Sequence, residues 1–283
     1  MKTRVMNAAD RGEGPYLYRF SLYNRVLHAL VIVSFLGLVA TGLPLRFSSS
    51  PWSTGLMALF GGPLAAGVIH RGCALITFGY FFAHLGDLTY RFFRSPSRKR
   101  MFWGPESMVP QPKDIRDVVQ MFKWFFGKAP QPQFDRYSYM EKFDYWGVFW
   151  GIAIIGTSGL FLWFPTFFAR FMPGWAFNIA TIVHGDEALL ASSFIFTIHF
   201  FNVHLRPDKF PIDTVIFTGR ATTGYMKEEH GQEYRRLAEA GELEGRVAPP
   251  ASRAAYLWSV VLGFMALAIG VTLIVLALSV LIW

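Results

Sequence analysis

The sequence predicts an all-α integral membrane bundle, with a four-helix core and a fifth transmembrane helix after it. Hydrophobic residues make up 53% of the 283 residues, and 16% are charged, against a usual ~25%. Several apolar segments reach the ~20 residues that a spanning helix needs. Basic residues gather in alternate loops, which is the pattern of a multi-pass membrane protein.

Five apolar segments carry this prediction. They cover residues 26–45, 63–92, 143–168, 175–204 and 255–283. The chain then divides into an N-terminal tail (1–25), a four-helix core (26–204) with a loop at 93–142, a polar connection (205–254) and the fifth helix (255–283). The connection is rich in Glu, Gly and Arg, so we expect it to be loosely ordered.

The placement of the basic residues predicts the orientation of the chain. Five Lys and Arg lie in the tail, eleven in residues 91–142 and eight in residues 206–253, which leaves Arg46, Arg71 and Arg170 elsewhere. The positive-inside rule therefore puts the N-terminus and both long loops in the cytoplasm and the C-terminus outside. The same asymmetry accounts for the net charge of +8 without nucleic acid as a partner.

Residues 113–128 predict an amphipathic helix in the first long loop. Ile115, Val118, Val119, Phe122 and Phe126 follow the helical period. We expect this helix to lie flat on the membrane lipid. A docking helix for a partner protein is the alternative.

The single cysteine, Cys73, excludes several cofactor classes. One thiol cannot form an intrachain disulfide, a covalent Cys-x-x-Cys-His haem site or an iron–sulfur cluster held by this chain alone. Cys73 is expected to be a small packing residue.

Histidines are the chemistry-bearing residues of the apolar segments. Six of the seven lie in or at the ends of predicted spans, and His230 is expected to be an ordinary solvated residue. His70 and His84 are fourteen residues apart, and His184 and His199 fifteen. At ~1.5 Å per residue each pair is separated by ~21–23 Å, most of a bilayer core. Interhelical hydrogen bonding would explain one such histidine, but polar side chains in lipid are costly and tend to be functional.

The predicted topology sorts these histidines into two levels. His70 and His184 belong to the outer leaflet, and His28, His84, His199 and His204 to the inner leaflet. A bis-histidine haem b needs two imidazoles on facing helices, and the outer leaflet offers one pair. In the inner leaflet, a step of ~100° per residue turns His199 toward the same side as His184 and turns His204 away. His28 and His84 both remain possible partners of His199.

Small residues and one arginine complete the prediction. A wide, flat haem needs small neighbours, and the first three spans supply Gly37, Gly42, Gly72, Gly79, Gly147, Gly151, Gly156 and Gly159. Close helix packing uses glycine equally well. Arg71 could neutralise haem propionates or serve topology.

Several motifs resemble those of the cytochrome b subunits of formate dehydrogenase (gamma) and nickel–iron hydrogenase. They are Arg19-Phe-Ser-Leu-Tyr-Asn-Arg25-Val-Leu-His28, Thr41-Gly-Leu-Pro-Leu45, Ile69-His70-Arg71, Glu141-Lys-Phe-Asp-Tyr-Trp146-Gly, Thr157-Ser-Gly-Leu160 and Leu205-Arg-Pro-Asp-Lys-Phe-Pro211 after His204. The resemblance covers roughly residues 19–220. It departs from the family at His84, His204 and the fifth helix.

The resemblance implies a function. It makes His28 and His199 the ligands of an inner haem b, and His70 and His184 those of an outer one. It implies a prokaryotic inner (cytoplasmic) membrane cytochrome in a hetero-oligomeric complex. Electrons would pass between menaquinone or ubiquinone near the inner haem and an extracytoplasmic subunit of the multihaem cytochrome c, iron–sulfur, or molybdenum or hydrogenase kind. Candidate proton or quinone residues are His84, Asp87, His204 and Asp208.

Other interpretations stay open at this point. His84 and His204 could bind quinol, relay protons, hold a third haem or simply form hydrogen bonds. The whole chain could be a histidine-containing transporter, which predicts polar residues at mid-membrane and broken helices. It could also be a non-redox anchor of a complex, which predicts binding that survives His→Ala changes.

Overall fold

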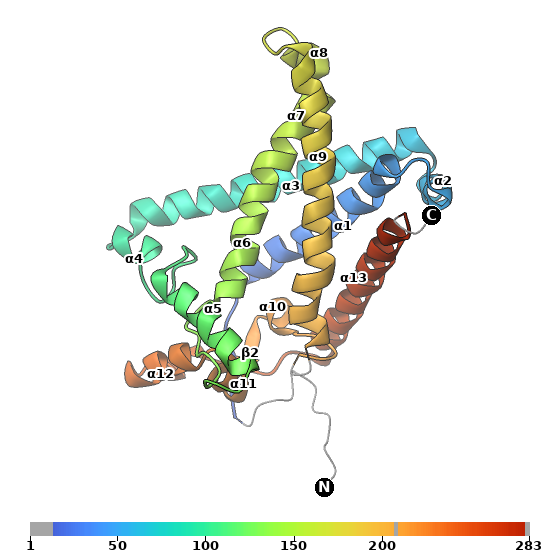
Figure 1. The fold of residues 1–283 in the computed structure, drawn as a ribbon. Coiled ribbons are helices and arrows are strands. Elements are labelled where there is room, and N and C mark those ends of the chain that lie inside the picture. The colour runs from blue at the N-terminus through green and yellow to red at the C-terminus, as the bar shows by residue number, and fades with distance from the viewer. Residues whose placement is uncertain (1–13, 207–208, 281–283) are drawn as a thin grey trace. The chain divides into compact units, whose positions relative to one another are not determined.

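The structure is a computed structural model that describes residues 14–206 and 209–280. Within these residues, five helical segments are long and apolar enough to cross a membrane. They are Leu22–Arg46, Pro63–Arg94, Tyr139–Trp163, Gly174–Leu205 and Arg253–Ser279 (Figure 1). The prediction of an all-α, multi-pass membrane protein is therefore confirmed.

Three spans are single helices and two are composite. The single ones are α1 (Leu22–Arg46), α3 (Pro63–Arg94) and α13 (Arg253–Ser279). The third span joins α6 (Tyr139–Gly151), the π-helical turn η1 (Ile152–Gly156) and α7 (Thr157–Trp163). The fourth joins α9 (Gly174–Phe194) to two more π-helical turns, η2 (Ile195–His199) and η3 (Phe201–Leu205).

Two short helices follow the first and third spans. They are α2 (Pro51–Leu59) and α8 (Pro165–Phe168). The third span thus ends at Trp163, earlier than predicted. The residue before a proline is disfavoured in the α conformation, and Phe164 accordingly leaves it before Pro165.

The chain divides into two compact units. The first, called here the polar unit, comprises Met1–Arg25, His84–Trp146 and Arg206–Val260. The second, called the span unit, comprises Val26–Ala83, Gly147–Leu205 and Val261–Trp283.

The apolar core of the span unit joins α1, the fourth span and α13. Its buried members are Val39, Leu43, Phe196, Phe200, Ala266, Leu273 and Ala277. Gly270 allows this contact, because an added Cβ would lie 2.5 Å from the Phe200 ring and 2.7 Å from the Phe196 ring. Small residues at helix interfaces are the usual device for close packing in lipid.

The polar unit contains folded structure over residues 209–254, so the predicted loosely ordered connection is wrong for that part of the chain. It forms α10 (Val215–Thr218), α11 (Thr223–Glu229), α12 (Gly231–Glu239) and the 3₁₀ turn η4 (Glu244–Arg246). The loop between the second and third spans adds α4 (Arg98–Phe102) and α5 (Pro112–Phe125), and the latter confirms the predicted helix.

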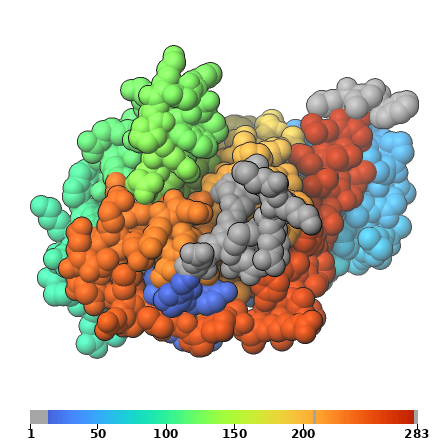
Figure 2. All heavy atoms as spheres, turned by 90° about the horizontal axis from the view of Figure 1, so that it is seen from below, coloured from blue at the N-terminus to red at the C-terminus, as the bar shows by residue number. Residues whose placement is uncertain are grey.

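A small antiparallel sheet ties the start of the described chain to this segment. Strand β1 (Tyr16–Tyr18) lies between β2 (Arg220–Thr222) and β3 (Val247–Ala248). Leu17 is opposite Ala221 on one side and Val247 on the other. Figure 2 shows the first described residues, in blue, bordered by this orange segment. The partners are about 200 residues apart, so local sequence patterns gave no sign of the pairing.

A buried charge cluster lies beside the sheet. Glu233 has no exposed surface, and its two carboxylate oxygens accept hydrogen bonds from Arg19 at 2.6 Å and Arg136 at 3.1 Å. Burial alone would raise the pKa of Glu233, but the two guanidinium groups lower it. Removing one partner of such a cluster typically costs 3–5 kcal/mol, because a charge is left buried without compensation.

A second cluster surrounds Lys209, which is also buried. Its ammonium donates to Asp213 at 2.9 Å, and the Tyr225 hydroxyl donates to the same carboxylate oxygen at 2.8 Å. Burial opposes the charge of Lys209, yet Asp213 and its neighbours raise the pKa of the amine. These two clusters explain how a polar segment folds without a large apolar core.

His230 belongs to the first cluster and is 4% exposed, so its prediction as a solvated residue is wrong. Its Nδ1 donates to the Asp135 carbonyl at 2.7 Å, and its Nε2 accepts from Arg19 at 2.9 Å. A second proton on the ring would face the guanidinium. Burial, followed by the charge of Arg19, lowers the pKa of His230 well below 6.5.

We expect this histidine to make the polar unit sensitive to acid. Below pH ~6.5 the His230 ring takes up a proton in the unfolded chain but stays neutral in the folded protein. The free energy of unfolding is therefore highest above pH ~6.5 and decreases as the pH falls toward the lowered pKa of His230. His230→Gln keeps one donor and one acceptor but does not titrate. From about pH 6.5 to about pH 5.5, the native unit should lose on the order of 1 kcal/mol and the variant much less. Protection factors of the β1 amides in hydrogen exchange measure this, and equal pH slopes would contradict it.

Candidate functional site

In the span unit, α1 runs antiparallel to both α3 and the fourth span. Thr41 on α1 lies beside His70 on α3, and Gly37 lies beside Cys73, so these two helices run in opposite directions. Arg46, the last residue of α1, meets Asp186 in α9, whereas Phe35 in the middle of α1 meets Phe196 in η2. This register brings His70 and His184 together.

The rings of His70 on α3 and His184 on α9 meet edge to face. Their centroids are 6.2 Å apart and their planes are inclined by 64°. This is the pair that the sequence assigned to the outer leaflet.

Hydrogen bonds fix which nitrogen of each ring carries the proton. The Nδ1 of His184 lies 2.9 Å from the Ile155 carbonyl, which can only accept, so Nδ1 is the donor. The Nδ1 of His70 lies 2.9 Å from the Thr41 hydroxyl, which itself donates to the Gly37 carbonyl at 2.6 Å. Both Nε2 atoms therefore keep their lone pairs. This is the arrangement of metal-binding histidines, whose other nitrogen donates to a backbone or side-chain acceptor.

The spacing of the pair fits a shared metal between the rings. Two metal–imidazole bonds of ~2 Å each, extended by the radius of each ring, place the ring centres about 6 Å apart. The observed separation is 6.2 Å. Among the described residues no group of three or more His, Cys, Asp or Glu is placed to hold a metal ion. The candidate ligands are the two imidazoles of this pair, and two imidazoles are the ligand set of a bis-histidine haem.

Two glycines lie directly against these rings. An added Cβ at Gly42 would be 3.4 Å from Cε1 of His70, and one at Gly159 would be 2.9 Å from Cε1 of His184. Gly37 and Gly156 instead lie against Cys73 and Phe78 of a neighbouring helix. At these two positions glycine serves close helix packing. The other predicted glycines in the spans, Gly72, Gly79, Gly147 and Gly151, have open space or only ordinary contact around them.

Three π-helical turns in the described chain coincide with candidate residues. Turn η1 contains Ile155, whose carbonyl accepts the hydrogen bond from His184. Turn η2 ends at His199, and η3 contains His204. Single π turns inside α-helices occur frequently at functional sites. These turns could not be predicted from the sequence, because the apolar periodicity of a helix hardly changes when a π turn inserts one residue.

The inner histidines fall into two groups. His28 and His199, both of the span unit, lie within electrostatic range of one another. His84 belongs to the polar unit, where its Nε2 forms a 2.9 Å hydrogen bond with the Tyr145 hydroxyl. The sequence left His28 and His84 as rival partners of His199, and that choice stays a prediction. Tyr145 was not predicted as a site residue.

The remaining predicted site residues have structural contacts of their own. Arg71 stacks over the Trp163 ring at 6.0 Å. Asp87 pairs with Arg91 at 2.8 Å. His204 is buried, with its ring 5.4 Å from that of Phe200. Asp208 lies outside the described residues.

An ion pair near the His184 level was also missed. Arg46 contacts Asp186 at 2.5 Å and packs against Gly185, the residue after His184. The signal was present in the sequence, because Asp186 and Glu187 interrupt an apolar span and such charges require partners. Glu187 accepts from the Trp150 indole at 3.2 Å.

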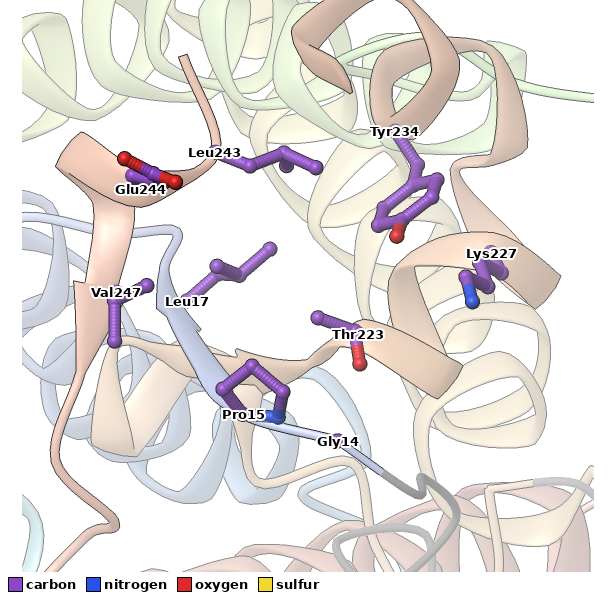
Figure 3. A pocket seen from close by; sticks show the side chains of 9 residues that line it. All are labelled: Gly14, Pro15, Leu17, Thr223, Lys227, Tyr234, Leu243, Glu244 and Val247. Carbon is purple, nitrogen blue, oxygen red and sulfur yellow. The ribbon is translucent and has the colours of Figure 1, made fainter. Parts of the chain in front are cut away.

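An open hollow in the polar unit contains none of the predicted site residues. Leu17, Leu243 and Val247 supply apolar surface to it, and Lys227 and Glu244 supply charge (Figure 3). Its mixed, open lining lacks the converging polar groups of a catalytic pocket.

Compared with models of protein families and with curated proteins, the chain finds no match. The family resemblance of the motifs therefore stays a prediction.

The contact between Gly159 and His184 makes a packing prediction. Gly159→Ala should force the ring to move or the helices to separate, and we expect a loss of roughly 1–3 kcal/mol of stability from overpacking. Gly86→Ala is the matched control, because a Cβ there meets nothing within 4 Å and alanine favours helix. Thermal unfolding in detergent compares the two, and equal midpoints would contradict this packing.

Proposed function

We propose that this chain is the membrane cytochrome b of a quinone-linked redox complex, holding one haem b between His70 and His184 and another between His28 and His199. The observation that carries the proposal is the facing His70–His184 pair, whose Nδ1 atoms are both engaged so that both Nε2 atoms keep lone pairs. Bound haem would supply reversible one-electron chemistry, which no side chain of the pair provides.

The protein's own contribution at the outer pair is orientation. Thr41 and the Ile155 carbonyl hold the two rings in one tautomer, and such acceptors also raise the basicity of the ligand nitrogen. Gly42 and Gly159 leave room for the rings on their own helices.

The two proposed pairs would lie at different levels of the fourth span. His184 and His199 are separated by fifteen residues of one continuous helical segment, or ~23 Å of axial rise. Two haems at these levels would divide electron transfer across the bilayer into shorter steps. By resemblance, menaquinone or ubiquinone would react near the inner pair, and an extracytoplasmic redox subunit would meet the outer pair.

Proton exchange with quinone needs titratable groups near the cytoplasmic ends of the spans. The hydrogen-bonded His84 and Tyr145 supply such a pair on the second and third spans. Asp87 lies three residues beyond His84, paired with Arg91. These contacts support a place for His84 and Asp87 in proton transfer.

The two alternative functions fit the contacts less well. A transporter would line a path with polar groups at mid-membrane, whereas the core that joins α1, the fourth span and α13 is apolar. A plain membrane anchor gives no reason to hold two imidazoles edge to face in lipid, where unpaired polar groups are costly.

A spectrum tests the proposal most directly. The purified protein should give a reduced-minus-oxidised spectrum of b-type haem and about two haems per chain by pyridine haemochrome titration. A folded protein from haem-replete cells without any haem would end the proposal.

Single-ligand variants test the pairing. His184→Ala should remove one haem and leave the other, because the proposed inner ligands, His28 and His199, lie at another level. His84→Ala is the control and should keep both, since its ring pairs with Tyr145. Loss of both haems from folded His184→Ala protein, or of neither, would contradict the assignment.

A further inference from the structure

Helix α5 presents its apolar side outward. Ile115, Val119, Phe122 and Phe126 are 71%, 48%, 62% and 74% exposed. At ~100° per residue these four side chains fall within a sector of roughly 60°. A single exposed apolar residue needs no explanation, but a continuous stripe of four marks a contact surface.

The acidic side of the same helix faces the protein. Asp114 and Asp117 are buried, at 8% and 6% exposure. Asp114 also closes a capping box with Gln111 at the start of the helix, and Asp117 pairs with Lys113. The helix is therefore inverted relative to that of a soluble protein, in which the apolar side is turned inward.

Ion pairing holds the start of α5 at the beginning of the third span. The Lys142 ammonium, 7% exposed, lies 2.9 Å from both carboxylate oxygens of Asp114. Lys142 is the fourth residue of α6, and Figure 1 shows α5 beside the start of that helix. Because this span begins at Tyr139, the bond fixes the N-terminus of α5 at the level where a membrane-crossing helix enters the bilayer.

We infer that α5 is an interfacial helix, whose exposed stripe lies in a lipid surface carrying anionic headgroups. The partner is lipid rather than another protein because of the level at which Lys142 holds the helix and because of the charges around the stripe. Arg116 and Lys123 are exposed and flank it on one side, at roughly 70–90° from its centre. The acids of α5 point away from it, so the outward surface combines apolar and cationic groups only, which is the pattern of helices that bind anionic membranes.

Site-directed spin labelling of the full-length protein tests this inference. Cys73 is the only cysteine, so Cys73→Ala gives a background in which Val119→Cys and Phe122→Cys each carry one nitroxide. Glu239→Cys, at the exposed end of α12, is the matched water-facing control. The proteins are reconstituted in vesicles of phosphatidylcholine with phosphatidylglycerol, and collision with oxygen is compared with collision with a water-soluble nickel chelate.

Labels in the stripe should collide several-fold more with oxygen relative to nickel than the Glu239→Cys label does. Two positions are used so that the result does not depend on one variant folding. Nickel-accessible labels at both positions would show a free aqueous surface, and labels shielded from both reagents would show a protein contact such as a second copy; either result overturns the inference.

The headgroup charge is tested separately. Immersion of the Val119→Cys label should be deeper with phosphatidylglycerol than in phosphatidylcholine alone, and Arg116→Gln with Lys123→Gln should remove that difference. Equal immersion in both lipids would overturn the anionic part of the inference. None of these readouts requires haem, so they stand independently of the proposed redox function.

Discussion

The hydrogen bond from His184 Nδ1 to the Ile155 carbonyl is the contact on which the candidate site depends. In lipid a ring N–H must find an acceptor, because no water is present to replace one. A carbonyl accepts only, so the bond decides the tautomer and leaves Nε2 as a Lewis base aimed away from it. Thr41 achieves the same for His70 by donating its own proton to Gly37. Two helices thus present matched lone pairs without any charged residue in the pair.

This arrangement depends in turn on the register of the helices. A slip of one helical turn moves a side chain by ~5.4 Å, which would separate Thr41 from His70 and Ile155 from His184. Apolar packing resists such a slip poorly in a bilayer, since lipid tails are as apolar as the side chains they replace. The Arg46–Asp186 ion pair is a directional contact between α1 and α9 that forms only in this register.

Features that depend on local sequence could be predicted, and features that depend on distant residues could not. Apolar runs predicted the five spans, and the intervals between histidines predicted two levels of histidines along the helices, because both patterns are local. The acceptors at Thr41 and Ile155 could not be found this way, since each depends on a neighbouring helix and one on a π turn. The fold of the polar unit was missed for the same reason: β1 pairs with strands over 200 residues away, and His230 is buried by charges distant in sequence.

In the polar unit, cations at the ends of three spans form further directional hydrogen bonds. Arg25 in α1 donates to the Phe217 carbonyl at 2.6 Å, Lys142 in α6 to Asp114 at 2.9 Å, and Arg206, directly after the fourth span, to Glu229 at 2.5 Å. Each of these cations is within four residues of a span terminus. Loop cations satisfy the positive-inside rule wherever they lie along a loop, but only these positions can also restrain a helix along its axis. Each of these three hydrogen bonds is therefore placed to restrain the end of its own helix within the polar unit.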